Sequence, residues 1–209
     1  MSAKEELPNK LLVEGNDDKH VVFALRDKFD VAKNFTVVDC KGIERLIEGI
    51  PARLKASDAD RLGIIVDADV EIINRWTSIK NILTAKGFDV PVDLPKHGLI
   101  VINGQGFKVG VWIMPNNTTG GMLEDFISFL VPKGDQLFTV ASETLQLIEQ
   151  KKLNKFTTGH RSKALIHTWL AWQEEPGTPL GLSITKKYLT TDDDTCKRFI
   201  DWMNTLFNS

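Results

Sequence analysis

Apolar residues in the first half of the chain alternate between short runs and sets with helical spacing. A short apolar run bounded by polar residues is typical of a strand covered on both faces, and apolar positions three or four residues apart indicate an amphipathic helix. The short runs are residues 11–15, 35–40 and 62–70, and helical spacing follows them over residues 21–29, 43–54 and 72–83. This order predicts an α/β fold with a mainly parallel central sheet flanked by helices.

Two sequence features predict how the first helix begins and where the second one kinks or ends. The side chain of Asn16 or Asp17 is expected to cap the first helix, because short polar side chains accept hydrogen bonds from the free N–H groups of a helix N-terminus. Pro51 lies within the second helix. It is expected to kink or end that helix, because proline lacks a backbone N–H and clashes with the preceding turn.

The pattern changes after the third helix. Residues 98–103 and 107–115 predict two strands joined by a short glycine-containing turn, which is the spacing of a hairpin and adds an antiparallel strand to the sheet. Helices are predicted from there to the end of the chain, and the last one follows the acidic triplet 192–194, whose carboxylates stabilise a helix N-terminus. We expect an α/β domain over residues 1–135 and a helical C-terminal extension packed on it over residues 136–209, or one domain that contains both.

The third predicted strand ends in two carboxylates, Asp67 and Asp69. In an open α/β sheet, ligands bind at the carboxyl ends of the strands. Two carboxylates this close repel each other, so one is protonated or a cation lies between them. With no histidine or thiol nearby, these hard oxygen ligands favour Mg²⁺. Alternatively, one aspartate caps the following helix and the other is solvated.

Three further acidic residues, Glu14, Asp18 and Glu124, fall at strand ends or helix starts. Together with the two aspartates they form a candidate set of ligands for Mg²⁺ or Mn²⁺, because carboxylates that converge on one crevice are unstable without cations. Such ions neutralise phosphate oxygens and activate water. Glu14 could instead act as a general acid or base with a raised pKa. A shared ion requires Glu14 and Asp67 to lie within roughly 10 Å of each other.

A site for phosphoryl chemistry also needs a cation that holds a non-bridging phosphate oxygen. Lys163, on a predicted C-terminal helix, is the candidate for this catalytic role, with Arg161, Lys108 and Lys41 as others. The histidines do not form a tight metal pair and are expected to be structural or surface residues. No P-loop, dinucleotide-binding fingerprint or serine-hydrolase motif is present in the sequence.

The net charge, the cysteines and the length of the apolar runs indicate which partners and which location to expect. A formal net charge of −2 gives no global signal for nucleic-acid binding, although a local basic groove is compatible with it. Cys40 and Cys196 are the only cysteines, and their wide separation favours free thiols in a reducing compartment. No apolar run reaches the length of a transmembrane helix or forms a signal core. We therefore expect a cytoplasmic protein with no membrane partner.

The motifs LLVEGNDD, which begins at Leu11, and IIVDAD, which begins at Ile64, resemble those of the Toprim domain. This metal-binding fold is shared by topoisomerases, bacterial primases, a ribosomal-RNA maturase and the OLD-family nucleases. Its members carry a Glu after the first strand and a DxD motif after the third, which Glu14 and the pair Asp67 and Asp69 match in order and separation. The resemblance covers about the first half of the chain and implies a Toprim-like fold.

Within that fold, the sequence is most similar to the OLD-type branch and to an uncharacterised family of stand-alone Toprim-like proteins, the DUF3226 type. Glu14 and Asp18 match the EGxxD motif of OLD-type nucleases, and Glu124 matches a later Glu in an LE step. Lys163 would correspond to a lysine that assists catalysis there. The resemblance implies Mg²⁺-dependent cutting or joining of phosphodiesters in DNA or RNA. Strand passage is not expected, because Tyr188, the only tyrosine, is not placed like a topoisomerase nucleophile.

Two alternatives remain open at this point. A strand that ends in DADV also fits the start of the haloacid dehalogenase phosphatases, in which Asp67 would be a nucleophile and Asp69 an acid/base. The second alternative is a non-catalytic Toprim-like module with a vestigial metal site that binds a nucleic acid, a nucleotide or a protein. The near-neutral charge favours this second alternative.

Overall fold

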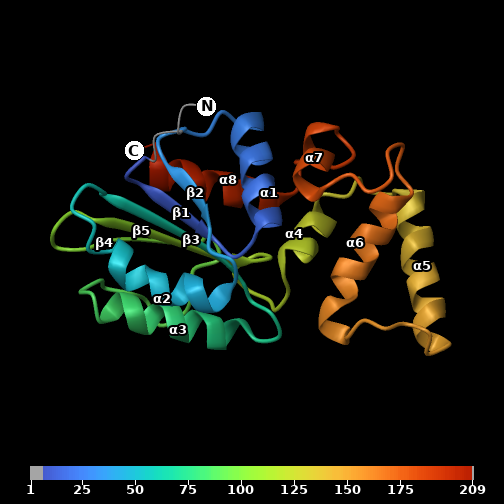
Figure 1. Cartoon of the computed structure of the whole chain (residues 1–209), viewed down its shortest axis with the longest axis horizontal. Helices are drawn as coiled ribbons and strands as arrows, with labels where there is room; N and C mark the ends of the chain where they lie inside the picture. The colour runs from blue at the N-terminus through green and yellow to red at the C-terminus, as the bar shows by residue number, and fades with distance from the viewer. Residues whose placement is uncertain (1–6, 209) are drawn as a thin grey trace.

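A five-stranded, mostly parallel β-sheet forms the centre of the protein (Figure 1). The computed structural model describes residues 7–208. The strands, in spatial order, are β2 (Thr36–Asp39), β1 (Lys10–Val13), β3 (Arg61–Asp67), β5 (Lys108–Met114) and β4 (Leu99–Ile102). Strand β4 runs antiparallel to β5, and the other pairs of neighbours are parallel. The predicted α/β fold and the hairpin of β4 and β5 are confirmed.

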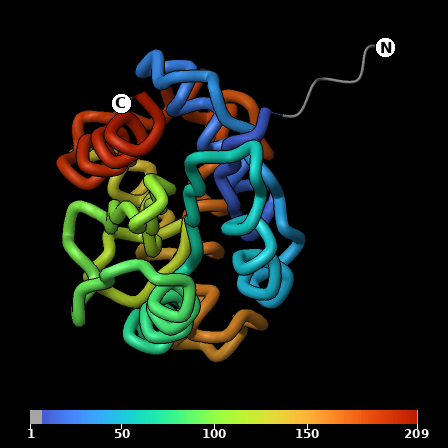
Figure 2. The backbone as a smooth tube through the Cα atoms, turned by 90° about the vertical axis from the view of Figure 1, so that its left-hand side faces the viewer, coloured from blue at the N-terminus to red at the C-terminus, as the bar shows by residue number. Residues whose placement is uncertain are grey.

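Helices cover both faces of this sheet (Figure 2). One face is covered by α2 (Ile43–Arg53) and α3 (Ile72–Thr84), and the other by α1 (Asn16–Lys28) and α8 (Asp194–Phe207). Successive side chains of β3 lie on opposite faces of the sheet. Ile64 belongs to the core beneath α2 and α3, and Ile65 belongs to the core beneath α1 and α8. The apolar run of β3 is therefore buried on both sides, as the sequence predicts.

The chain after the sheet is helical, and its last helix returns to the sheet. The helices before α8 are α4 (Leu123–Phe129), α5 (Gln136–Gln150), a 3₁₀ turn (Thr158–His160), α6 (Arg161–Ala171) and α7 (Leu180–Thr185). Helices α5 and α6 lie side by side, α4 contacts α6, and α7 packs on α1 (Figure 1). The predicted helical C-terminal part is confirmed, and the domain boundary at residue 135 stays a prediction. Within the described residues, no helix is long and apolar enough to cross a membrane.

Three predicted details of the helix ends have different outcomes. The prediction that Asn16 or Asp17 caps α1 is wrong, because Gly15 occupies the N-cap position and its N–H donates to the Asp18 carboxylate. Pro51 does not end α2, which continues to Arg53. The acidic triplet does start a helix: Asp193 is the N-cap of α8, and its side chain accepts a hydrogen bond from a backbone N–H of the first turn at 2.7 Å.

Two glycines on neighbouring strands allow α8 to lie close to the sheet. Gly63 of β3 is opposite Gly110 of β5 in the parallel register. A Cβ atom on Gly63 would lie 3.1 Å from Leu206 Cδ2 of α8, and one on Gly110 would lie 2.7 Å from the same atom. Both distances are shorter than an ordinary carbon–carbon contact. The packing of α8 therefore depends on the missing side chains at these two positions.

Substituting Gly110→Ala should lower the melting temperature by about 2–10 °C, because an added methyl group in a filled core costs roughly 1–3 kcal/mol. Thermal denaturation followed by circular dichroism measures this change. Gly104→Ala is the matched control, because a Cβ atom in this turn would meet nothing within 4 Å. An unchanged melting temperature for Gly110→Ala would show that the packing of α8 does not depend on this glycine.

Candidate carboxylate site at the strand ends

Glu14 and Asp67 lie next to each other because the strands that precede them are neighbours. Strands β1 and β3 pair in parallel, so the residues that follow them meet at one edge of the sheet. The Oε1 atom of Glu14 accepts a hydrogen bond from the backbone N–H of Asp67 at 2.7 Å. The two residues therefore satisfy the proximity that a shared ion requires.

Two helix starts bring further carboxylates to the same edge. Asp18, in the first turn of α1, is only 7% exposed; its Oδ2 atom accepts a hydrogen bond from the N–H of Gly15 at 3.1 Å, and its Oδ1 atom has no partner. Glu124, in the first turn of α4, is 3% exposed. The start of α4 is held at this edge because Asp67 Oδ1 accepts a hydrogen bond from the N–H of Leu123 at 2.9 Å.

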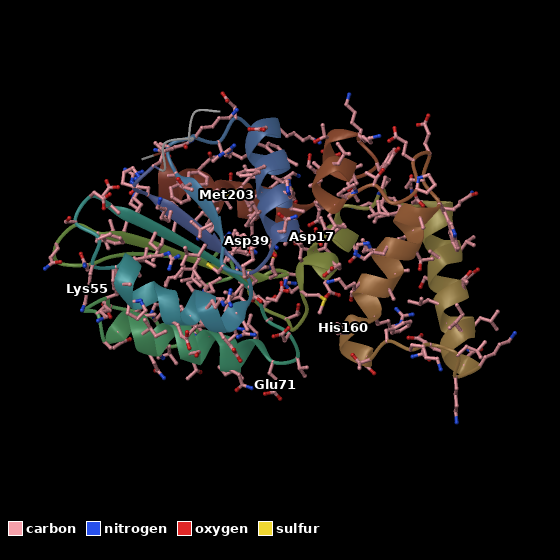
Figure 3. All side chains as sticks on the ribbon, in the orientation of Figure 1. Asp17, Asp39, Lys55, Glu71, His160 and Met203 are labelled. Atoms are coloured by element: carbon pink, nitrogen blue, oxygen red, sulfur yellow. The ribbon has the colours of Figure 1, made fainter. Side chains whose placement is uncertain are left out.

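All of these carboxylates except Glu14 line a small cavity of about 210 Å³, which we call the acidic cavity. Asp18, Asp67 and Glu124 line it together with Lys163 of α6, and the exposed Asp17 lies at its rim. In Figure 3, Asp17 lies where the sheet meets the C-terminal helices, whereas Lys55 lies at the opposite end of the sheet. The cavity therefore opens at the carboxyl ends of the strands, where ligands bind in open α/β sheets.

Burial and mutual repulsion raise the pKa values of these carboxyl groups. For Asp67, burial is the main cause, and the charges of Asp18 and Glu14 add to it, so the pKa rises to about 9. For Asp18, burial and then the charge of Glu14 raise the pKa to about 7. The pKa of Glu14 is also raised, mainly by burial. Without a cation, this group of carboxyls therefore retains protons at neutral pH.

Glu124 faces two basic side chains of α6. Lys163 Nζ lies 3.0 Å from Glu124 Oε1, and His167 Nε2 lies 4.0 Å from the same atom. Partial burial lowers the pKa of Lys163, but the hydrogen bond and the charge of Glu124 outweigh it, so this pKa is raised overall. The hydroxyl of Ser162 donates a hydrogen bond to the carboxylate of Asp125, which ties α6 to α4. Lys163 is thus held, fully charged, over the acidic cavity.

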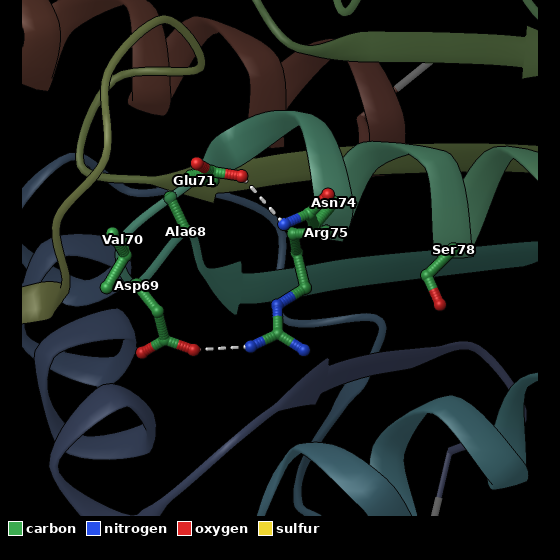
Figure 4. A pocket seen from close by; sticks show the side chains of 7 residues that line it. All are labelled: Ala68, Asp69, Val70, Glu71, Asn74, Arg75 and Ser78. Carbon is green, nitrogen blue, oxygen red and sulfur yellow. Dashed lines mark hydrogen bonds and ion pairs between the residues drawn. The ribbon is translucent and has the colours of Figure 1, made fainter.

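Asp69 does not line the acidic cavity and instead pairs with Arg75 (Figure 4). Its backbone is in the left-handed region, with φ of 54°. Arg75 donates through Nη2 to Asp69 Oδ2 at 2.5 Å and through Nε to the backbone carbonyl of Asp67 at 3.0 Å. Asp69 and Arg75 line a separate cavity of about 330 Å³. The structure therefore places the two carboxylates of the DxD motif in different cavities.

The donor set of the acidic cavity suits a hard divalent cation. Asp18, Asp67 and Glu124 offer carboxylate oxygens, which Mg²⁺ and Mn²⁺ prefer. The Oδ1 atom of Asp18 is buried without a hydrogen-bond donor, so a cation would satisfy it and would relieve the repulsion that raises the pKa values. Within residues 7–208, no three His, Cys, Asp or Glu side chains are already arranged to hold a metal ion. Binding would therefore require these side chains to change rotamer.

Sequence reasoning did not find two basic residues next to the carboxylates. His167 lies four residues after Lys163, so helical spacing places both on one face of α6 and could have indicated it. Arg75 is six residues from Asp69, and only the turn between β3 and α3 brings them together. The alternative cations Lys41 and Arg161 pair with carboxylates outside the acidic cavity.

Comparison with known families identifies the chain. The model of a family described as "Protein of unknown function (DUF3226)" matches residues 8–208. The chain belongs to this family. No curated protein and no solved structure shows a significant match. The family description names no activity, so the function has to be inferred from the site.

Raising the pH should destabilise the protein when divalent cations are absent. An aspartate in an unfolded chain titrates near pH 4, to a rough approximation, whereas Asp67 keeps its proton up to about pH 9. Between these values the folded state binds more protons than the unfolded state, so the free energy of unfolding falls as the pH rises. Asp67→Asn stays neutral, so it should flatten this fall and raise the melting temperature at mildly alkaline pH by about 2–6 °C.

Thermal denaturation in buffers that contain a chelator, across this pH range, measures the effect. Asp89→Asn removes an exposed carboxylate between α3 and β4 and is the control, which should melt like the wild type. If Asp67→Asn instead lowered stability at alkaline pH, a protonated Asp67 would be the wrong description of the folded state.

Proposed function

We propose that the protein is a Mg²⁺- or Mn²⁺-dependent enzyme that cuts or joins phosphodiester bonds in DNA or RNA, in the manner of a nuclease. The observation that carries this proposal is the buried Asp18 Oδ1 atom, which lacks a hydrogen-bond partner beside a cavity that Asp67 and Glu124 also line. Carboxylates that face a lysine across one small cavity are the groups that a hard cation and a phosphate would need.

The arrangement of the motifs supports a Toprim-like domain related to the OLD-type nucleases. Glu14, which follows the first strand, contacts Asp67, the first aspartate of the motif at the end of the third strand. Asp18 and Glu124, which match the EGxxD and LE motifs of the OLD-type branch, line the same cavity as Asp67. We base the Toprim-like assignment of this DUF3226 protein on this combination of order, strand adjacency and shared cavity.

In this proposal, each residue at or near the acidic cavity has a separate role. Asp18, Asp67 and Glu124 would hold the cation, which supplies positive charge against the phosphate oxygens. Glu14 holds the backbone of Asp67 through its hydrogen bond, and its raised pKa suits it to accept or donate a proton. Lys163 would hold a non-bridging phosphate oxygen, since its ammonium group is charged and half exposed at the cavity.

Asp69 would join the ligands only after breaking its ion pair with Arg75. In the proposal it is therefore a ligand that is recruited when the site is occupied.

We also propose a cytoplasmic location, which is consistent with the buried, unpaired thiols of Cys40 and Cys196.

The purified protein should cleave nucleic acid when Mn²⁺ is supplied, and Asp67→Ala and Glu14→Ala should each abolish this cleavage. Asp67→Ala should also weaken the binding of Mn²⁺, because it removes a carboxylate of the acidic cavity. The assay uses single-stranded, duplex and nicked substrates, and calorimetric titration of Mn²⁺ follows metal binding independently of cleavage.

Asp89→Ala is the matched control for these variants, since it removes an exposed carboxylate away from the site. Cleavage that survives both site substitutions would point to a contaminant and would contradict the proposal. Mn²⁺ binding without any cleavage would favour a non-catalytic binding module instead. A beryllofluoride adduct on Asp67 would favour an aspartyl-phosphate enzyme.

Lys163→Ala should reduce cleavage by about 10²–10³-fold, the usual effect of removing one group that stabilises transition-state charge. Its affinity for Mn²⁺ should stay equal or increase, because Glu124 loses its ion-pair partner. Lys163→Arg should restore part of the activity by restoring the charge. A parallel loss of Mn²⁺ binding and cleavage in Lys163→Ala would assign the lysine a structural role rather than a catalytic one.

A further inference from the structure

Positive charge is concentrated in the connection between α5 and α6. Residues 151–163, which we call the basic segment, contain five Lys and Arg and no Asp or Glu. The remaining residues of the chain contain 21 Lys and Arg against 28 Asp and Glu. The net charge of the chain is therefore near neutral although the basic segment is positively charged, because the rest of the chain is negatively charged overall.

Most of this charge is exposed and is not neutralised by carboxylates. The exposed basic residues of the segment are Lys151, Lys152, Lys155, His160 and Lys163. Arg161 pairs with Glu149, and Lys163 pairs with Glu124. Within residues 7–208, Lys151, Lys152 and Lys155 form no ion pair with a carboxylate. These three ammonium groups are therefore available to an anion from outside the chain.

The basic segment leads from the edge of the protein to the acidic cavity. It starts where α5 ends, at the lower right of Figure 1. It reaches the N-terminal end of α6 at His160 (Figure 3). It ends at Lys163, which lines the cavity. A long anion bound along the segment would therefore be directed to the cavity.

A polyanion that approaches the acidic cavity meets the exposed Asp17 at its rim, so positive charge nearby favours its binding. Ammonium groups that neutralise successive phosphates release counterions and so drive the binding of nucleic acids. Basic helices that bind anionic membranes also present a continuous apolar face, whereas most of this segment is an irregular loop and a 3₁₀ turn. The surface therefore fits a phosphodiester backbone better than a lipid surface.

We propose that the basic segment binds the phosphodiester backbone of a nucleic acid and directs it into the acidic cavity. The role as a substrate guide rests on the proposed function. The binding itself needs no cation in the cavity, so it can be tested in a chelator, where no cleavage occurs. A failure of binding is then distinguishable from a failure of catalysis.

The test compares two triple variants in the full-length protein. Lys151, Lys152 and Lys155 are replaced by alanine in one variant. In the control, Lys28, Lys55 and Lys96, which are also exposed, are replaced by alanine, so both variants lose the same charge. Fluorescence anisotropy with labelled single-stranded and duplex oligonucleotides, titrated with salt in the presence of EDTA, measures the dissociation constant and its salt dependence.

The variant in the basic segment should bind about tenfold more weakly or worse at low salt, and its slope of log K against log salt should fall by about two to three. The control should bind like the wild type. Equal losses in both variants, unchanged binding in the segment variant, or no binding by the wild type would each contradict the proposal. Segment-dependent binding to phosphatidylserine vesicles but not to oligonucleotides would show that the partner is a membrane surface.

Discussion

The repulsion among carboxylates at one edge of the sheet is the constraint on which the site depends. Glu14, Asp18, Asp67 and Glu124 are brought there by two adjacent parallel strands and two helix starts. Hydrogen bonds from backbone N–H groups hold three of them, but they leave one buried oxygen of Asp18 without a partner. Without a cation, the carboxyl groups with raised pKa values keep protons at neutral pH, and this reduces their mutual repulsion. A divalent cation would replace those protons. In the proposed function, the same arrangement of carboxyl groups is protonated without metal and binds the cation when it is present.

The central fold could be predicted from local patterns because its strands and helices have clear periodicity. The apolar run of β3 is completely buried between two layers of helices, so an uninterrupted run of apolar residues is enough to predict this strand. The cap of α1 could not be predicted in this way, because three polar residues follow Gly15 and only the local geometry selects Asp18 as the acceptor. Helix α7 is only six residues long, which is too short to show a helical period.

The candidate site was predictable to the extent that strand order determines it. Once β1 and β3 are neighbours, Glu14 and Asp67 must meet, and sequence spacing then adds Asp18. The different position of Asp69 was not predictable, because it follows from a left-handed backbone and a contact with Arg75 on the next helix. The place of Lys163 depends on how α6 packs on α4. Such packing between distant segments leaves no periodic trace in the sequence.

The position of α8 has a consequence for how the protein is made on the ribosome. Residues at the starts of β2 and β3 contact α8 directly: Phe35, just before β2, stacks on Phe207 with ring centroids 3.8 Å apart, and Arg61 donates to the carbonyl of Phe207 at 2.8 Å. The sheet is complete once residue 114 has emerged, but the part of one face that α8 covers stays exposed until this last helix is synthesised. The nascent chain therefore carries an exposed apolar surface for nearly half of its translation. A chaperone that shields this surface would protect the protein during that interval.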